Sequence, residues 1–257
     1  MTYVVICGVA LLASGLTFFS GFGLGTLLLP AFALFFPIDQ AVAMTAVVHF
    51  LNGLFKLWLV GRAADRGVVL RFGLPALVAA LVGAWVLVWL SGTQPVLTYT
   101  LAGRDMSVTP VKLTIGVLLL LFAAAELLPE ARRPSFGPRY LALGGVLSGF
   151  FGGLSGMQGA LRSAFLARAG LSKEAFVASG VVIACLIDVS RLGVYSQALL
   201  AEGARLDYGL LAAAVGAAFA GAALGNRYLK KLTMRGVQRI VAVMLFAMGV
   251  GLLGGAL

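Results

Sequence analysis

Three basic side chains, Lys56, Arg162 and Arg191, lie inside long apolar segments of the sequence. A charged side chain within the hydrocarbon core of a membrane is energetically costly, so each of these residues is a candidate functional residue. Arginine presents a planar fork of donors that matches an oxyanion such as a carboxylate or a sulfonate. Arg162 follows a glycine-rich break and is therefore the best candidate to meet an anion. The alternative is that its side chain snorkels toward the membrane surface.

Two glycine-rich breaks could supply further donors to an anion. A helix that starts after a break leaves its first N–H groups without partners and directs its positive dipole end toward the break. Glycine lets a ligand approach that backbone, while serine and glutamine add side-chain hydrogen bonds. The alternative is that the glycines only allow close packing of helices. The predicted substrate-binding residues are Ser20, Gly21, Gly23, Gly25, Ser155, Gly156, Gln158, Gly159 and Arg162.

Two helix faces carry the remaining polar groups within apolar segments. His49, Asn52 and Lys56 share one face by their spacing, and Asp188 and Arg191 share another. We expect Lys56, Asn52 and Arg191 to gate or support the site. Asp188 and His49 are candidates for carrying a proton. Two alternatives stay open: Asp188 and Arg191 simply neutralise each other, and His49 is a hydrogen-bonded core residue.

The elements that position these residues must be transmembrane helices. The sequence is 61% hydrophobic and only 11% charged, with a mean hydropathy of +1.05. This composition predicts an all-α, polytopic transmembrane bundle in a lipid bilayer. The net charge of +10 lies mostly in short loops, where the distribution of positive charge in membrane proteins accounts for it, so we expect no nucleic-acid partner.

Eight apolar segments are long enough to span a bilayer, and two of them are too long for one crossing. The first and fifth segments hold the glycine-rich breaks and predict re-entrant hairpins or pairs of short spans. The segments are Val4–Phe36, Gln40–Gly61, Phe72–Leu90, Val111–Leu128, Leu141–Ala169, Ala175–Gln197, Tyr208–Arg227 and Val237–Leu257.

The two broken segments belong to matching halves of the chain. The same 135 residues separate Gly21 from Gly156 and Lys56 from Arg191. We therefore predict one membrane domain built of a first repeat, residues 1–135, and a second, residues 136–257. Each repeat is a broken hairpin followed by three transmembrane helices.

Loop charges predict that the two repeats are inverted. The three most basic loops are Arg62–Arg71, Pro129–Arg139 and Arg227–Arg239. If each broken segment folds back on itself, all three loops lie on the cytoplasmic side, as positive loops do. Both termini are then outside, and the hairpin tips approach the midplane from opposite faces, as expected for a carrier with alternating access.

The sequence resembles the TauE/SafE family of sulfite exporters over essentially its whole length. The likeness rests on Gly15–Pro30 with its spaced glycines, Phe36–Ala43, Gly149–Gly156 and Leu171–Ala175. In the second half Met157–Ala160 replaces the usual glycines, a departure that bears on the substrate more than on the fold. The resemblance implies transport of sulfite, thiosulfate or organosulfonates across the bacterial inner membrane, usually by export coupled to an ion gradient.

We therefore predict a multi-pass secondary transporter of small sulfur-containing anions, with no enzymatic activity, cofactor or metal. A passive anion channel is the main alternative. A membrane scaffold would leave the paired breaks without a purpose. An intramembrane protease is disfavoured: Gly153–Gly156 matches a G-x-S-G pattern, but His49 lies upstream and no histidine follows. The sequence leaves homo-oligomerisation open.

Overall fold

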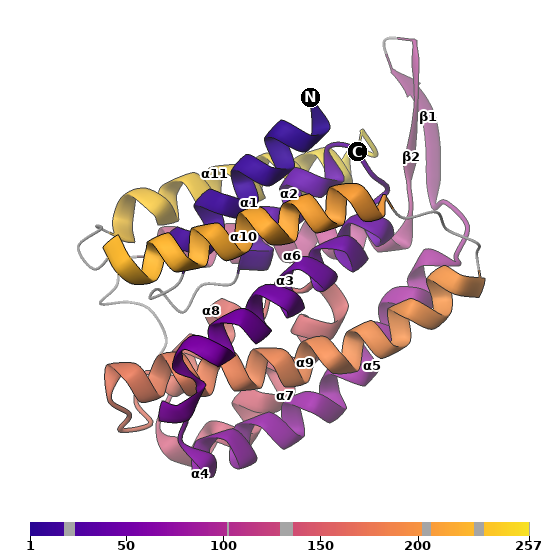
Figure 1. Ribbon diagram of the computed structural model, residues 1–257. Helices are drawn as coiled ribbons and strands as arrows, with labels where there is room; N and C mark the ends of the chain where they lie inside the picture. The colour runs from indigo at the N-terminus through magenta and orange to yellow at the C-terminus, as the bar shows by residue number, and fades with distance from the viewer. Residues whose placement is uncertain (18–23, 102, 129–135, 202–206, 229–233, 257) are drawn as a thin grey trace.

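The computed structural model describes the chain except for residues 18–23, 102, 129–135, 202–206, 229–233 and 257. The described residues form a bundle of helices with one short β-hairpin, as the all-α prediction requires (Figure 1). The first half contains α1 Thr2–Leu16, α2 Leu24–Ala33, α3 Ile38–Val60, η1 Gly61–Ala63, α4 Arg66–Val68, the π-helical turn η2 Val69–Gly73, α5 Leu74–Ser91, β1 Leu97–Leu101, β2 Arg104–Val108 and α6 Pro110–Leu127.

The second half repeats this order without the β-hairpin. It contains η4 Pro138–Tyr140, α7 Leu141–Ser155, α8 Gly159–Leu166, α9 Lys173–Ala201, α10 Tyr208–Tyr228 and α11 Met234–Leu253. In each half, two short helices precede three long ones, so both broken segments are divided as the glycine-rich breaks predict.

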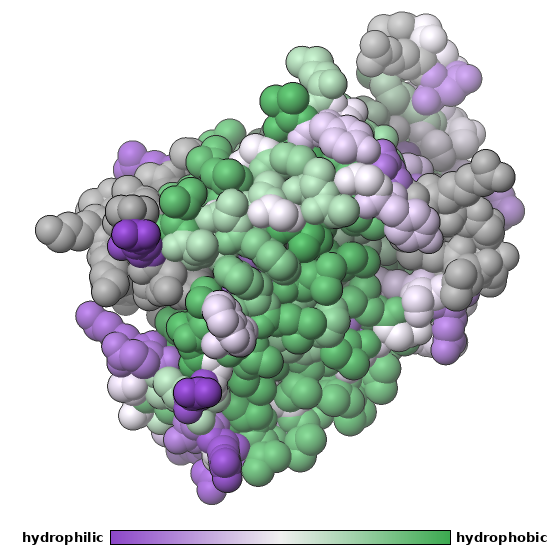
Figure 2. Space-filling view, viewed as in Figure 1, coloured by the Kyte–Doolittle hydropathy of each residue, from purple (hydrophilic) through white to green (hydrophobic). Residues whose placement is uncertain are grey.

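Several helices are long and apolar enough to cross a membrane. They cover Ile38–Ala63, Arg66–Ser91, Pro110–Leu127, Lys173–Gln197 and Tyr208–Gly225, and shorter apolar helices cover Thr2–Leu16, Leu24–Ala33 and Val241–Leu253. On the face shown in Figure 2, hydrophobic residues form a wide belt and hydrophilic residues gather at its two ends. This distribution is that of a protein surrounded by lipid.

Helices of the two halves pack against each other in corresponding pairs. Helix α1 packs on α10, and their counterparts, α7 and α5, pack on each other. Helix α3 also packs on α9, and α6 packs on α11. Each of these pairs joins one helix from each half. The two halves are therefore packed against each other along these four helix pairs.

The glycines of α7 allow that helix to lie directly against α5. A Cβ atom added to Gly145, Gly149 or Gly153 would fall 2.1 to 2.2 Å from a carbonyl oxygen of η2 or α5. These carbonyls belong to Phe72, Ala76 and Ala80, in the same order along the chain, so the two helices run parallel. Close helix packing therefore explains these three glycines, in agreement with the alternative that glycines allow helices to approach each other.

The two halves enter the bundle from opposite ends. Tyr3 at the start of α1 donates a hydrogen bond to Asp207, 3.0 Å away, just before α10 begins. Helix α7 instead begins beside η2, which contains the basic residue Arg71. Figure 1 shows both termini and the β-hairpin at one end of the bundle and α4 at the other. We call these the terminal end and the basic end.

The β-hairpin has no counterpart among the segments predicted from sequence, which name no element between Leu90 and Val111. Strands β1 and β2 pair antiparallel with Leu97 opposite Val108. The hydroxyl of Tyr99 donates to the carbonyl of Gly254 at 2.5 Å, and the amide of Ser107 donates to Gly255 at 3.4 Å. The hairpin therefore covers the chain just after α11 at the terminal end.

Candidate functional site

The second hairpin turns at Gly156, between α7 and α8. Gly156 has a φ of +78°, in the left-handed region that glycine adopts without steric cost. The hydroxyl of Ser148 donates to the carbonyl of Gln158 at 3.1 Å and fixes the turn from within. Gly159 begins α8, so the predicted residues Ser155, Gly156, Gln158 and Gly159 lie together at this tip.

The first hairpin meets the second through Gly25. Of the predicted residues in the first break, Ser20, Gly21 and Gly23 lie outside the described residues, while Gly25 is in the first turn of α2. A Cβ atom on Gly25 would lie 3.2 Å from the carbonyl oxygen of Gly156. We call this contact the tip junction. It brings the two repeats together in the interior of the bundle.

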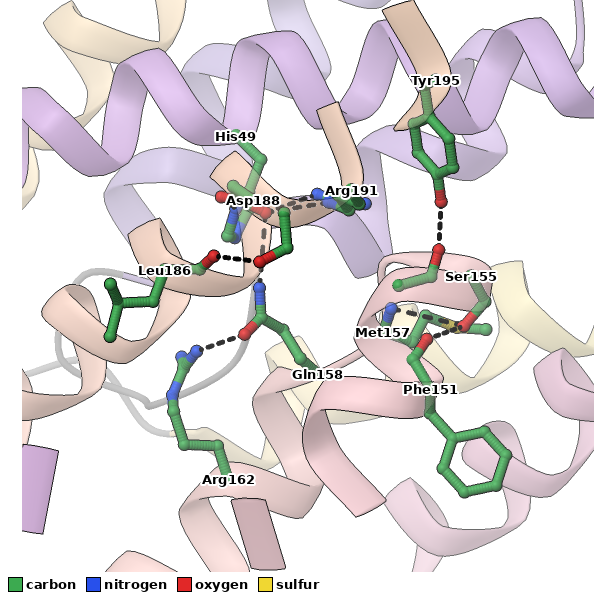
Figure 3. Close-up of polar contacts among 12 residues, drawn as sticks. His49, Phe151, Ser155, Met157, Gln158, Arg162, Leu186, Asp188, Arg191 and Tyr195 are labelled. Atoms are coloured by element: carbon green, nitrogen blue, oxygen red, sulfur yellow. Dashed lines mark hydrogen bonds and ion pairs between the residues drawn. The ribbon is translucent and has the colours of Figure 1, made fainter. Parts of the chain in front are cut away.

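An ion-pair cluster lies beside the tip junction and joins α3 to α9 (Figure 3). The Nδ1 atom of His49 is 2.5 Å from Oδ2 of Asp188, and Nε of Arg191 donates to Oδ1 of Asp188 at 2.9 Å. The side chains of Asp188 and Arg191 are completely buried, and His49 is 7% exposed. Asp188 therefore neutralises Arg191, as the sequence allowed, and also contacts His49 in the other half.

Gln158 connects this cluster to Arg162. Its Nε2 atom lies 3.4 Å from Oδ1 of Asp188, and its Oε1 atom accepts a hydrogen bond from Nη1 of Arg162 at 3.1 Å (Figure 3). Arg162 is only 7% exposed. The structure thus contradicts the snorkelling alternative, because the guanidinium group is turned inward and held by the tip of its own hairpin.

A cavity of about 50 Å³ lies next to Arg162, toward the basic end. It is several times larger than the roughly 10–15 Å³ that one water molecule requires. Along α3 the lining runs from His49 through Asn52 to Lys56, and along α9 it runs from Ala184 back to Phe176. The cavity therefore extends from the ion-pair cluster toward the residues at which α3 ends and α9 begins.

The surroundings of the cavity favour negative charge. Lys56 and Arg162 both line it, and both are buried. Buried positive charge is stabilised when a ligand of opposite charge enters, and the interaction is stronger there than in water because the local dielectric constant is low. Asn52 adds an amide to the lining and accepts a hydrogen bond from Ser14 at 3.0 Å, which ties α1 to the polar face of α3.

Sequence reasoning did not select Thr45, which is buried one turn before His49 and lies beside Gly25. Tyr195, which shares the helix face of Asp188 and Arg191 by its spacing, donates its hydroxyl to the carbonyl of Gly153. Thr45 could have been found by extending the polar face of α3 by one turn, because residues four apart share a helix face.

Ser155 is not arranged as a nucleophile. Its hydroxyl donates to the carbonyl of Phe151 at 2.9 Å and lies 3.4 Å from the amide of Met157. His49 is engaged by Asp188 instead of Ser155. A serine without an adjacent base is a poor nucleophile, so the described residues do not form the pair that a G-x-S-G protease needs. They also contain no group of three or more His, Cys, Asp and Glu side chains placed to hold a metal ion.

Comparison with known proteins agrees with the membrane fold. The model of the family described as "Sulfite exporter TauE/SafE" matches residues 6–252, which is nearly the whole chain. No curated protein matches the chain.

Proposed function

The chain belongs to the sulfite exporter TauE/SafE family, a family of membrane transporters of sulfite-type anions, and from that premise we propose how it works. It is a secondary transporter that moves small sulfur-containing anions such as sulfite, thiosulfate or organosulfonates by alternating access. Export is the direction that the family description supports. The substrate binds between the hairpin tips, in the cavity beside Arg162.

The observation that carries this proposal is the placement of Arg162. Its guanidinium group is buried, lines the cavity and is oriented by Gln158 at 3.1 Å. A planar guanidinium group can donate two parallel hydrogen bonds to two oxygens of a sulfite or sulfonate group. Lys56 would add a point charge from α3. The first turn of α8 would add backbone N–H donors at Gly159.

The first hairpin completes the site in this proposal. Ser20, Gly21 and Gly23 are proposed as donors to the anion from the first repeat. Ser155 and Gly156 would shape the second tip. Arg191 and Asn52 would support the site, since Arg191 orders Asp188 and Asn52 lines the cavity.

Proton coupling would act through His49 and Asp188. Their side chains are 2.5 Å apart and connect to Arg162 through Gln158. A proton gained or lost by this pair changes the charge beside the arginine that binds the substrate, so it would change how tightly the anion is held. Because the pair joins α3 to α9, the same change would act on the contact between the two repeats.

We also propose that the protein lies in the bacterial inner membrane with its basic end in the cytoplasm. Arg62, Arg66 and Arg71 are exposed at that end, and Arg139 lies at the start of η4 and α7. Positive loops favour the cytoplasmic side. Both termini would then lie outside, and the cavity would face the cytoplasm, from which an exporter receives its substrate.

Reconstitution into liposomes tests the proposed function. Uptake of labelled sulfite, thiosulfate and a small organosulfonate is followed with and without an imposed pH gradient, and empty liposomes are the control. Saturable flux of at least one of these anions is expected. A flux that rises linearly with concentration would favour a channel, and no flux of any of them would overturn the substrate class.

A further inference from the structure

The polar groups in the interior continue past the ion-pair cluster toward the terminal end. Along α3, Thr45 precedes His49 by one turn, whereas Asn52 and Lys56 follow it. Along α9, Arg191 follows Asp188 by one turn, whereas the cavity lining stops before Asp188, at Ala184. Because the two helices run in opposite directions, Thr45 and Arg191 lie on the side of the His49–Asp188 pair that faces away from the cavity.

Both residues have buried donors without a hydrogen-bond partner in the described part of the chain. These are Oγ1 of Thr45, whose residue is 1% exposed, and Nη1 of the completely buried Arg191, whose guanidinium group also lies close to the hydroxyl of Tyr195. Nη2 of Arg191 is 2.8 Å from Oδ1 of Asp188, but it is not aligned for a hydrogen bond. Buried polar groups in folded proteins are nearly always hydrogen-bonded, so an exception needs an explanation.

The tip junction lies against both of these groups. Nη1 of Arg191 is 2.6 Å from the position that a Cβ atom would occupy on Gly156. The methyl group of Thr45 is 3.6 Å from the equivalent position on Gly25, and a ring carbon of His49 is 3.8 Å from it. The tip junction therefore lies directly beside Nη1 of Arg191 and beside the side chain that carries the Thr45 hydroxyl.

We infer that Thr45 and Arg191 form a second anion subsite, which the tip junction closes in this conformation. This inference rests on the proposed function and extends it. The substrate first occupies the cavity beside Arg162 and later meets Thr45 and Arg191, when the hairpin tips separate and the path opens toward the terminal end. The ligand class is the same small oxyanion, because a hydroxyl group and a guanidinium group both donate hydrogen bonds to oxyanion oxygens.

The arrangement gives each end of the path its own donors. Asp188 lies between them and holds Arg191 by its Nε atom, so the unpaired Nη1 stays available for a substrate oxygen. A transported anion that passes Asp188 would exchange the donors of Arg162 for those of Arg191 and Thr45. Loss of the second set should slow movement across the protein without weakening the first binding step.

The experiment compares binding and flux in the Thr45→Val variant, using labelled thiosulfate as the probe. Valine keeps the shape of threonine and removes the unpartnered hydroxyl, so the variant should be at least as heat-stable as the wild type. We expect maximal flux in liposomes to fall on the order of tenfold, the effect of losing one hydrogen bond to a charged group. The dissociation constant of thiosulfate for the purified protein should stay within about twofold of the wild-type value.

Two further variants show whether the hydroxyl is responsible. Thr45→Ser restores the donor and should recover most of the flux. Ser190→Ala is the matched control, because Ser190 is a buried hydroxyl of α9 that donates to the carbonyl of Leu186 at 3.0 Å, and its flux should match the wild type. If Thr45→Val does not fold, Thr45→Ala is measured in its place with the same expectation.

The outcomes separate this inference from the function on which it rests. Wild-type protein that neither binds nor moves thiosulfate, sulfite or an organosulfonate overturns the proposed function, and the subsite with it. Wild-type transport with unchanged flux in Thr45→Val overturns the subsite alone. Loss of binding together with flux would also overturn it, because Thr45 would then belong to the first site.

Discussion

Lys56 and Arg191 occupy equivalent positions in the two halves of the chain, 135 residues apart, but their surroundings differ. Lys56 is 8% exposed and lines the cavity at the basic end. Arg191 is completely buried, is paired with Asp188 and lies against the tip junction toward the terminal end. The halves are inverted, so equivalent residues fall on opposite sides of the His49–Asp188 pair.

This difference shows how a repeated scaffold produces an asymmetric path. The helix pairs α1–α10 and α5–α7 are equivalent, but the cavity beside Arg162 lies on the basic-end side of the His49–Asp188 pair, whereas Arg191 and the tip junction lie on the other side. In a carrier with inverted repeats, exchanging the conformations of the two halves exchanges the open and closed ends. We therefore expect Lys56 to serve the side that is open here and Arg191 to serve the side that is closed.

The sharpest way to break the comparison is to remove the positive charge at each of the two positions, and Arg191→Ala should have the larger effect. It leaves Asp188 buried beside His49 without its arginine, and removal of one partner of a buried pair costs about 3–5 kcal/mol. We expect a lower midpoint in thermal unfolding of the purified protein and loss of transport. Arg191→Ala with the stability of the wild type would contradict the role of the ion pair.

How much of this arrangement the sequence could predict depends on how far apart along the chain the interacting residues are. The broken segments, the long helices and the Asp188–Arg191 pair follow from apolar length, glycine content and spacing within one helix. The contact between His49 and Asp188 spans 139 residues and joins two repeats, so no local pattern reveals it. The β-hairpin of Leu97–Val108 was also missed, because its two short strands are stabilised by contacts with the end of α11.

The substrate-binding roles of the residues in the two glycine-rich breaks are still predictions. The structure shows that Arg162 lines the cavity and is hydrogen-bonded to Gln158, and that Gly25 meets Gly156. It does not describe Ser20, Gly21 and Gly23. A glycine-rich pattern cannot separate packing from binding, since Gly145, Gly149 and Gly153 serve the α5–α7 contact while Gly156 forms the tip.

Arg162→Ala should have the next largest effect, and on transport more than on stability. The equivalent residue of the first half is Leu27, so this positive charge belongs to one repeat only. Truncating a buried charge that binds an anion costs about 2–5 kcal/mol. We expect thiosulfate flux to fall by roughly 30-fold or more. Arg168→Ala, an exposed arginine after α8, is the control. Unchanged uptake in Arg162→Ala would remove this residue from the site.

Lys56→Met should weaken binding more moderately and leave the fold intact. Methionine keeps the length of the side chain and removes the point charge at the edge of the cavity. We expect the KM for thiosulfate to rise about tenfold, which corresponds to roughly 1.4 kcal/mol, with little change in the thermal midpoint. A large loss of stability would show that Lys56 and Arg191 play the same structural part, and the proposed difference between the two halves would be wrong.

His49→Gln should have the smallest effect on flux and a specific effect on its response to pH. Glutamine can still hydrogen-bond to Asp188, so the fold and the contact between α3 and α9 should persist. Glutamine cannot take up a proton, however, so if His49 carries the coupled proton, the charge beside Arg162 no longer changes during the transport cycle. Flux without a gradient should fall by no more than about fivefold, the range of one modest hydrogen bond.

An imposed pH gradient that accelerates the wild type should have little effect on the His49→Gln variant. If the gradient still drives transport in His49→Gln but not in Asp188→Asn, the aspartate alone carries the proton, and the histidine serves to position it across the boundary between the two repeats.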